Sequence, residues 1–279
     1  MVVQNVIKAD GTVEPFSLEK LQRSMNRAAL DPEEVNIFSQ KLNGKLPDIT
    51  STDDIRRFVV KKLDKYHPYH SVRYSIRESM IKLGPSGYAF EQFIGQIFEA
   101  MGYHTSCGVI IRGECVTHEI DVMAINESKV DLAECKFHNT YGIKSDVKVA
   151  LYIWARSQDV KSAWSHYGIQ GKPMGHYWLI TNTKLTDDAT TYAQCKGLNV
   201  MSWNYPENNS LRLLIDKYGL YPVTSLKNSR ANFVQALVDR GIVTLKQLIN
   251  TDDRNLKDLN DHDVEFARRE ATQILEIHV

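Results

Sequence analysis

The pattern of apolar and polar positions divides the chain into three regions. In the middle region, apolar side chains between residues 88 and 101 recur at helical spacing, which predicts a helix with one buried face, ending at Gly102. Strand-like and helical runs then alternate. Strands are expected at 106–112, 117–125, 130–138, 177–180 and 198–203, and helices at 146–165 and 187–195. This order predicts a mixed sheet covered by helices on both faces.

The two flanking regions are mostly helical. The first begins with a short strand and a turn, which four helices follow. These elements are expected at 2–7, at Asp10-Gly11, from about Ser17, over 32–42, after Ser51 and over 68–83. The region ends at Gly84-Pro85, because proline cannot continue a helix, and the chain after Tyr221-Pro222 is purely helical. The prediction is an α/β protein with units at 1–84, 85–222 and 223–279.

Composition and charge narrow the classes of function. Lys plus Arg equals Asp plus Glu at 34 each, which excludes a protein that binds nucleic acid through bulk positive charge. The four cysteines form no CxxC pair, so neither a zinc knuckle nor a disulfide framework is indicated. No apolar stretch reaches the roughly 20 residues that cross a bilayer, and the N-terminus lacks a signal-peptide pattern. We therefore expect a cytoplasmic protein without a membrane partner.

Ionisable side chains gather on two of the predicted strands. Alternation places Glu119 and Asp121 on one face of the first strand, and Glu134 and Lys136 on one face of the second. A hairpin centred on Glu127-Ser128 would set Asp121 opposite Glu134 and Glu119 opposite Lys136, with Cβ atoms about 4.5 to 5.5 Å apart. Two such carboxylates repel unless a positive charge lies beside them. Lys136 and a hard cation such as Mg²⁺ are both candidates.

Asp121 and the triplet Glu134-Cys135-Lys136 resemble the D…(D/E)xK signature of restriction-endonuclease-like nucleases. The run from Gly87 to Phe93 resembles the first helix of the Mrr-type branch, and Glu91 matches its acidic position. Usual Mrr-type proteins carry glutamine where this chain has Glu134, and often proline where it has Ile120. The resemblance implies Mg²⁺ or Mn²⁺ held by Asp121, Glu134 and Glu91, with Lys136 positioning the attacking water. It also implies DNA as the substrate and a possible homodimer.

The first 82 residues resemble an ATP-cone domain, a regulatory module that binds ATP or dATP. The resemblance is carried by Val6 to Gly11, by Phe16, by Lys20-Leu21 and by the helix over 55–63. Typical cones have two consecutive basic residues where this chain has Lys8-Ala9. The resemblance implies that Lys8, Lys20 and Arg23, with Arg27 nearby, contact the nucleotide phosphates.

Together these features favour a Mg²⁺-dependent DNA endonuclease regulated by ATP or dATP. A catalytically silent, nucleotide-sensing protein that binds DNA or a protein partner is the alternative, and cleavage of RNA or branched DNA would use the same residues. His118 and His138 are expected either at the rim of the site or in structural roles, and Glu119 is expected either in the site or paired with Lys136. Arg240-Gly241-Ile242 weakly resembles a helix-hairpin-helix module that contacts the DNA backbone, although plain helical packing is the favoured interpretation.

Overall fold

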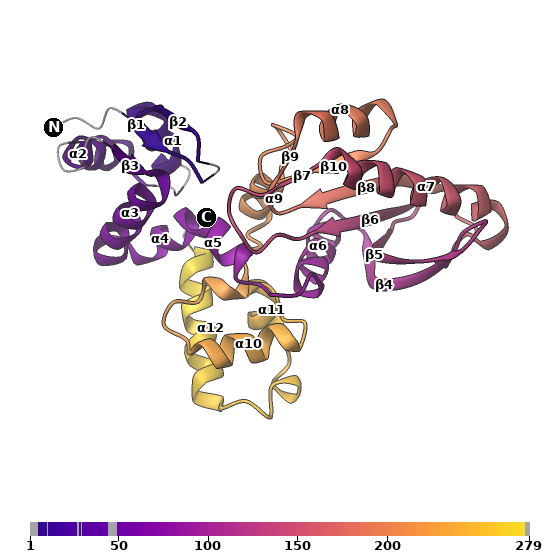
Figure 1. Ribbon diagram of the computed structural model, residues 1–279. Coiled ribbons are helices and arrows are strands. Elements are labelled where there is room, and N and C mark those ends of the chain that lie inside the picture. The colour runs from indigo at the N-terminus through magenta and orange to yellow at the C-terminus, as the bar shows by residue number, and fades with distance from the viewer. Residues whose placement is uncertain (1–4, 10, 27, 29, 44–48, 277–279) are drawn as a thin grey trace.

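The computed structural model describes residues 5–9, 11–26, 28, 30–43 and 49–276. Its first unit is a three-stranded sheet of order β2-β1-β3, with β1 antiparallel to β2 and parallel to β3, packed against helices (Figure 1). The strands are β1 Asn5–Ile7, β2 Val13–Pro15 and β3 Ile49–Ser51, and the helices are α1 Leu18–Asn26, α2 Pro32–Asn43, α3 Thr52–Tyr66, α4 Pro68–Tyr74 and α5 Ile76–Ile81. Predictions that concern residues 2–4, Asp10 and Arg27 fall outside the described residues.

One helix expected in this unit is interrupted. The segment predicted over 68–83 consists of α4 and α5, which are separated at Ser75. Ser75 has φ −98° and ψ 8°, between the helical and turn regions, and its N–H bonds to the carbonyls of Ser71 and Val72. The break lets α5 turn toward the middle unit.

The middle unit is a five-stranded mixed sheet of order β10-β8-β6-β5-β4. The strands β4, β5 and β6 are antiparallel neighbours, whereas β6, β8 and β10 run parallel. Its elements are α6 Tyr88–Ala100, β4 His104–Arg112, β5 Thr117–Ile125, β6 Val130–Lys136, α7 Val147–Tyr167, β8 Met174–Thr181, α8 Asp187–Cys195 and β10 Asn199–Met201, with the short pair β7 Lys144–Ser145 and β9 Lys184–Leu185. One face of the sheet packs on α6 and the other on α7 and α8.

The register of the β5–β6 hairpin agrees with the predicted one. Val122 pairs with Ala133 and Ile125 with Val130, as a turn centred on Glu127-Ser128 requires. The mixed α/β fold class is thereby confirmed, and β5 has the predicted bounds. Among the residues that the structure describes, no helix has both the length and the apolar character of a membrane span.

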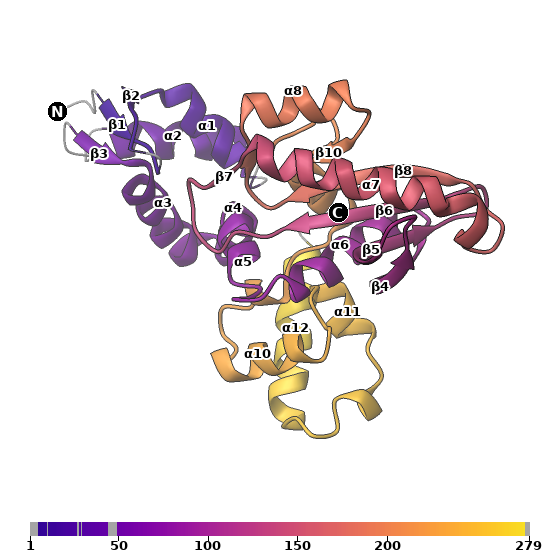
Figure 2. The same ribbon diagram turned by 45° about the vertical axis from the view of Figure 1, so that its right-hand side comes forward.

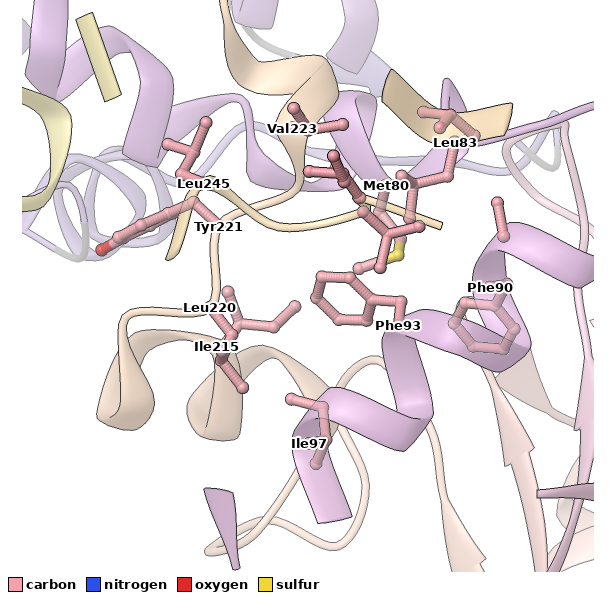
Figure 3. Packing of buried hydrophobic residues seen from close by; sticks show 14 of the residues in the cluster. Met80, Leu83, Phe90, Phe93, Ile97, Ile215, Leu220, Tyr221, Val223 and Leu245 are labelled. Atoms are coloured by element: carbon pink, nitrogen blue, oxygen red, sulfur yellow. The ribbon is translucent and has the colours of Figure 1, made fainter. Parts of the chain in front are cut away.

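The C-terminal helices share their hydrophobic core with the middle unit and with the end of the first. This region consists of α9 Leu211–Tyr218, η1 Val223–Ser225, α10 Ala231–Asp239, α11 Leu245–Asn250, η2 Asp253–Asn255 and α12 Asp261–Glu276. Figure 3 shows Met80 from α5, Phe93 from α6 and Val223 from η1 packed in one cluster. The three predicted units are thus joined by apolar packing, with α6 at its centre.

The segment Arg240-Gly241-Ile242 belongs to the turn between α10 and α11. Ile242 is buried in the shared core, together with Leu237 and Leu245 at the facing ends of the two helices. The packing interpretation therefore accounts for this segment.

Candidate functional site

Three carboxylates come from three different elements. Glu91 lies in the first turn of α6, Asp121 lies on β5 and Glu134 lies on β6. The described β5–β6 ladder ends at Val122 and Ala133, and beyond it the N–H of Cys135 donates a 2.7 Å hydrogen bond to Asp121 Oδ2. The Asp121 carboxylate thus joins the two strands where their backbone pairing ends, so Asp121 and Glu134 are not the directly paired residues that alternation predicts.

The strict alternation expected along β5 fails at Asp121. Val122 packs in the core on the α6 side, whereas Ile120 packs in the core on the α7 side. The neighbouring strand β4 shows the same change between Cys107 and Val109, and Gly108 between them has φ +64°. Because only glycine adopts this left-handed backbone without strain, Gly108 permits the change of face. Asp121 therefore lies at the point where β5 turns from one core to the other.

Glu134 is buried and its carboxylate is fully engaged. Arg156 of α7 donates to Oε2 at 2.7 Å, and the hydroxyl of Tyr177 on β8 donates to Oε1 at 2.9 Å. The side chain of Arg156 is only 13% exposed, and it also donates to the carbonyl of Glu119. The positive charge beside Glu134 is therefore Arg156, rather than Lys136 as considered above.

Burial and mutual repulsion favour the protonated form of these acids. Burial raises the pKa of Glu91 to about 7, with a further contribution from the charges of Asp121 and Glu119. Burial, followed by the charge of Asp121, raises the pKa of Glu134 to about 8, although Arg156 acts in the opposite direction. The pKa of Asp121 is also raised by burial. The cluster thus carries more negative charge than its protein partners compensate.

Lys136 lies at the end of β6 and is exposed. It lines a cleft of about 300 Å³ with Glu134 and with Lys148 and Tyr152 of α7. Among the residues that the structure describes, it forms no ion pair, so the predicted Glu119–Lys136 pair is not formed. The ammonium group is therefore available at the mouth of this cleft.

The two histidines have structural partners. His118 contacts Asp159 of α7 at 2.7 Å, and Asp159 also accepts the N–H of Cys115 in the β4–β5 turn. His138 exchanges backbone and side-chain hydrogen bonds with the buried Asn182, at 2.9 and 2.7 Å. Burial and the nearby charge of Lys136 lower the pKa of His138. His138 therefore anchors the chain that leaves β6.

The predicted phosphate ligands of the first unit are engaged by acids of their own unit. Lys8 lies 2.6 Å and Lys20 lies 3.1 Å from the two carboxylate oxygens of Glu14. Arg23 pairs separately with Glu19, one turn earlier on α1. The structure thus brings Lys8 and Lys20 together and leaves Arg23 apart.

A second candidate site lies between the first unit and the middle unit. It is a cavity of about 510 Å³ to which α3, α5, the β6–β7 loop and α9 contribute charged or aromatic side chains. Its charged lining consists of Arg56, Arg73, Arg77, Arg212, Asp53, Glu78 and Asp216, and its aromatic lining includes Tyr74, Tyr141 and Trp203. Four cations thus face three carboxylates in a space of the size that a small-molecule ligand occupies.

Comparisons with known proteins assign a family to the first unit and to the chain as a whole. Residues 4–79 match the family described as the ATP cone domain. The chain is 32% identical over 166 residues to an uncharacterized protein of Archaeoglobus fulgidus, a match that covers 60% of this chain and 89% of the relative. The chain belongs to the family of that archaeal protein. The predicted ATP-cone at the N-terminus is confirmed, and we call this unit the cone.

A solved structure agrees with the fold. The crystal structure of a protein of unknown function, AF1548, matches with a TM-score of 0.58 and 28% sequence identity, covering 68% of this chain and 99% of that chain. The two relatives carry no description of an activity. The restriction-endonuclease-like interpretation of the middle unit therefore stays a prediction.

Sequence reasoning did not find Arg156, Arg77 or Tyr141 as members of a site. The charge of Arg156 predicts a side chain that either contacts a phosphate backbone or is solvated. Only its place three residues after the buried Ile153 indicates that it faces the sheet. Arg77 lies in the short helix α5 between Glu78 and the buried Ile76, and this mixed pattern does not indicate which way its side chain points. Tyr141 lies in a loop, where no periodicity indicates the direction of a side chain.

Proposed function

We propose that the protein is a Mg²⁺-dependent DNA endonuclease whose activity is adjusted by ATP or dATP bound to the cone. The observation that carries this proposal is the cluster of Glu91, Asp121 and Glu134, which is acidic, partly buried and undercompensated. Its member Glu134 lines the same cleft as the exposed Lys136. Carboxylates with raised pKa values beside a lysine in a cleft are a frequent property of catalytic sites. They are also the hard oxygen ligands that Mg²⁺ prefers.

The cluster fits a divalent cation only in part. The carboxylate of Glu91 and the Oδ1 atom of Asp121 accept no hydrogen bond from the residues that the structure describes, so both can serve as ligands. Glu134 can join them only if Arg156 leaves it. The described residues contain no ready-made group of three His, Cys, Asp or Glu side chains around one metal position. A site with two carboxylates and several waters remains compatible with Mg²⁺.

In this proposal each residue has a separate role. Asp121 and Glu91 would hold the cation, with Glu134 as a further ligand after Arg156 moves. A bound Mg²⁺ would supply positive charge that acidifies a coordinated water and neutralises the phosphate. Lys136 orients the attacking water and stabilises the charge that develops on the phosphate oxygens. The site would contact phosphate and metal rather than a base, so RNA and branched DNA stay alternative substrates.

The test is the cleavage of supercoiled plasmid in Mg²⁺, with and without ATP. Lys136→Ala should reduce cleavage at least about 100-fold, because the developing charge loses its partner, while Mn²⁺ binding measured by calorimetry is retained. Lys161→Ala is the matched control, since Lys161 is an exposed lysine of α7 away from the cleft. Cleavage by Lys136→Ala at the wild-type rate would reject the assigned role. Duplex, single-stranded, branched DNA and RNA substrates are compared in the same assay.

A specific observation favours a second candidate, a nucleotide-sensing protein that does not cut. Both oxygens of Glu134 are occupied by Arg156 and Tyr177, as in a purely structural ion pair. In that case the wild-type protein would leave every substrate intact in Mg²⁺ while still binding ATP.

Sedimentation of the protein alone and with DNA addresses the proposed homodimer, because one site per chain cuts both strands only as a dimer or by sequential nicking.

A further inference from the structure

The cavity between the cone and the middle unit contains a partly buried cation, Arg77, for which the described residues provide no acidic partner. Burial lowers the pKa of Arg77, and the Nε atom of Arg77 is buried without a hydrogen bond. In the part of the chain that the structure describes, no carboxylate pairs with Arg77, although Arg56 beside it is bonded to both Asp53 and Glu78. Arg77 is therefore the uncompensated charge of this cavity, and an anion would compensate it.

Tyr141 occupies the place where such an anion would bind. Its ring lies 5.2 Å from the guanidinium carbon of Arg77 and 5.8 Å from that of Arg56. Its hydroxyl is buried and has no hydrogen-bond partner among the described residues. Cation–π contacts are weaker than charge-assisted hydrogen bonds to a phosphate, so a phosphate group would displace the ring from both arginines.

Tyr141 does not belong to the cone. It lies in the β6–β7 loop, five positions after Lys136, and in Figure 2 this loop extends from the sheet to the cone and returns to β7. The next residue, Gly142, has φ +84°, and a Cβ atom placed on it would lie 2.9 Å from the carbonyl oxygen of Ala9. The loop is therefore pressed against the cone at two adjacent residues.

The same loop is fixed to the sheet close to the candidate catalytic lysine. His138 bonds to Asn182 through its backbone N–H and carbonyl, and its Nε2 atom contacts Ser145 Oγ at 3.0 Å. Only two residues separate His138 from Tyr141. A movement of the backbone at Tyr141 would therefore act on this anchor and on the nearby end of β6.

We propose that a nucleoside triphosphate binds in this cavity and that its phosphates replace the ring of Tyr141 as the partner of Arg77 and Arg56. The loop that carries Tyr141 is then released and repositions Lys136. Trp203 and Arg212 from outside the cone complete the site, so the cone and the sheet bind the nucleotide jointly. This inference rests on the proposed function, both for the nucleotide and for the role of Lys136. Nucleotide binding and the position of Lys136 are coupled through Tyr141, whose ring competes with the nucleotide for the two arginines.

If Tyr141 competes with the nucleotide, two variants of the full-length protein should change the ATP affinity in opposite directions. The affinity is measured by calorimetry. Arg77→Gln should weaken ATP binding at least about tenfold, because a phosphate contact is lost. Tyr141→Ala should strengthen it about fivefold, because no ring has to be displaced. Tyr141→Phe should bind like the wild type, since it keeps the ring. Arg57→Gln is the matched control, because Arg57 is the neighbour of Arg56 on α3 but does not line the cavity.

Hydrogen exchange then tests the coupling. ATP should increase exchange in the peptide over 137–143 of the wild type, and Tyr141→Ala should show the increased exchange without ATP. Adenosine alone should have little effect, whereas inorganic triphosphate should reproduce part of it. Unchanged or weaker ATP binding by Tyr141→Ala, normal binding by Arg77→Gln, or exchange that ATP does not alter would each overturn the inference.

These measurements do not depend on cleavage, so the two proposals can fail separately. If the wild type cuts no substrate but the affinities shift as stated, the cavity and its tyrosine stand and the nuclease proposal falls. If the wild type cuts DNA but Tyr141→Ala does not alter ATP binding, only the inference falls. A wild type that binds no ATP would overturn the inference together with the regulatory part of the proposed function.

Discussion

The acidic cluster on the sheet and the arginine cavity beside the cone are unbalanced in opposite directions. At the sheet, burial raises the pKa of Glu91, Asp121 and Glu134, and the positive charge of Arg156 acts against this rise at Asp121 and Glu134. In the cavity, no carboxylate of the described residues pairs with Arg77, and burial lowers the pKa of Arg77. A fold tolerates such groups when a ligand of the opposite charge compensates them. The difference therefore points to a cation at one place and an anion at the other.

The largest effect on the acidic cluster is expected from the removal of Arg156. Arg156→Ala would leave Glu134 buried without a positive charge, and we expect a loss of about 3 kcal/mol in the free energy of unfolding. The measurement is urea denaturation at pH 9 in the presence of EDTA, where Glu134 is ionised. If the cluster holds a cation, added Mn²⁺ should stabilise this variant more than the wild type, because the ion replaces the guanidinium.

The double variant Arg156→Ala with Glu134→Gln serves as the control. It removes both charges and should recover part of the lost stability. Equal stabilisation of wild type and Arg156→Ala by Mn²⁺ would contradict the cation interpretation of the cluster.

The pH dependence of stability is the next largest effect. A raised pKa means that the folded state binds the proton more tightly than the unfolded chain, so the stabilisation is complete below about pH 4.5 and is lost as the pH rises through 7 and 8. In metal-free buffer the free energy of unfolding of the wild type should fall steadily between pH 5 and 9. Glu134→Gln should flatten most of this slope in urea titrations. A slope that is unchanged in the variant would mean that Glu134 does not titrate in this range.

The smallest expected effect concerns the exposed lysines of the cone. Glu14→Gln removes the partner of Lys8 and Lys20, and exposed ion pairs contribute little to stability. The midpoint of thermal unfolding should hardly change. ATP affinity, measured by calorimetry, should also hardly change, because neither lysine lines the arginine cavity. A strong loss of ATP binding would instead place the nucleotide at Glu14 and away from the arginine cavity.

The elements of the sheet were predictable because their patterns are local. The runs that form β5 and β6 differ in period from the helices around them, and the polar turn at Glu127-Ser128 determines their register. The cone was predictable from short motifs in the same way. Even so, alternation alone does not reveal the change of face at Asp121, because it depends on the left-handed backbone of Gly108 on another strand.

The partners of the candidate residues were not predictable, because they are set by packing between distant segments. Arg156 reaches Glu134 only because α7 lies on the face of the sheet that contains Tyr177. The cavity requires the break at Ser75, which orients α5, and the loop that carries Tyr141. Neither arrangement has a signature within a single stretch of sequence.

The contact between Gly142 and Ala9 also explains a departure of the cone from its usual sequence. Typical cones have a second basic residue next to the one at Lys8, where this chain has alanine. A Cβ atom on Gly142 would lie 3.5 Å from that of Ala9, so two main chains meet here with almost no side chain between them. A long basic residue at position 9 would have to cross this narrow seam. At Ala9 the cone therefore lacks one potential phosphate ligand, and at the same residue it contacts the loop of the middle unit.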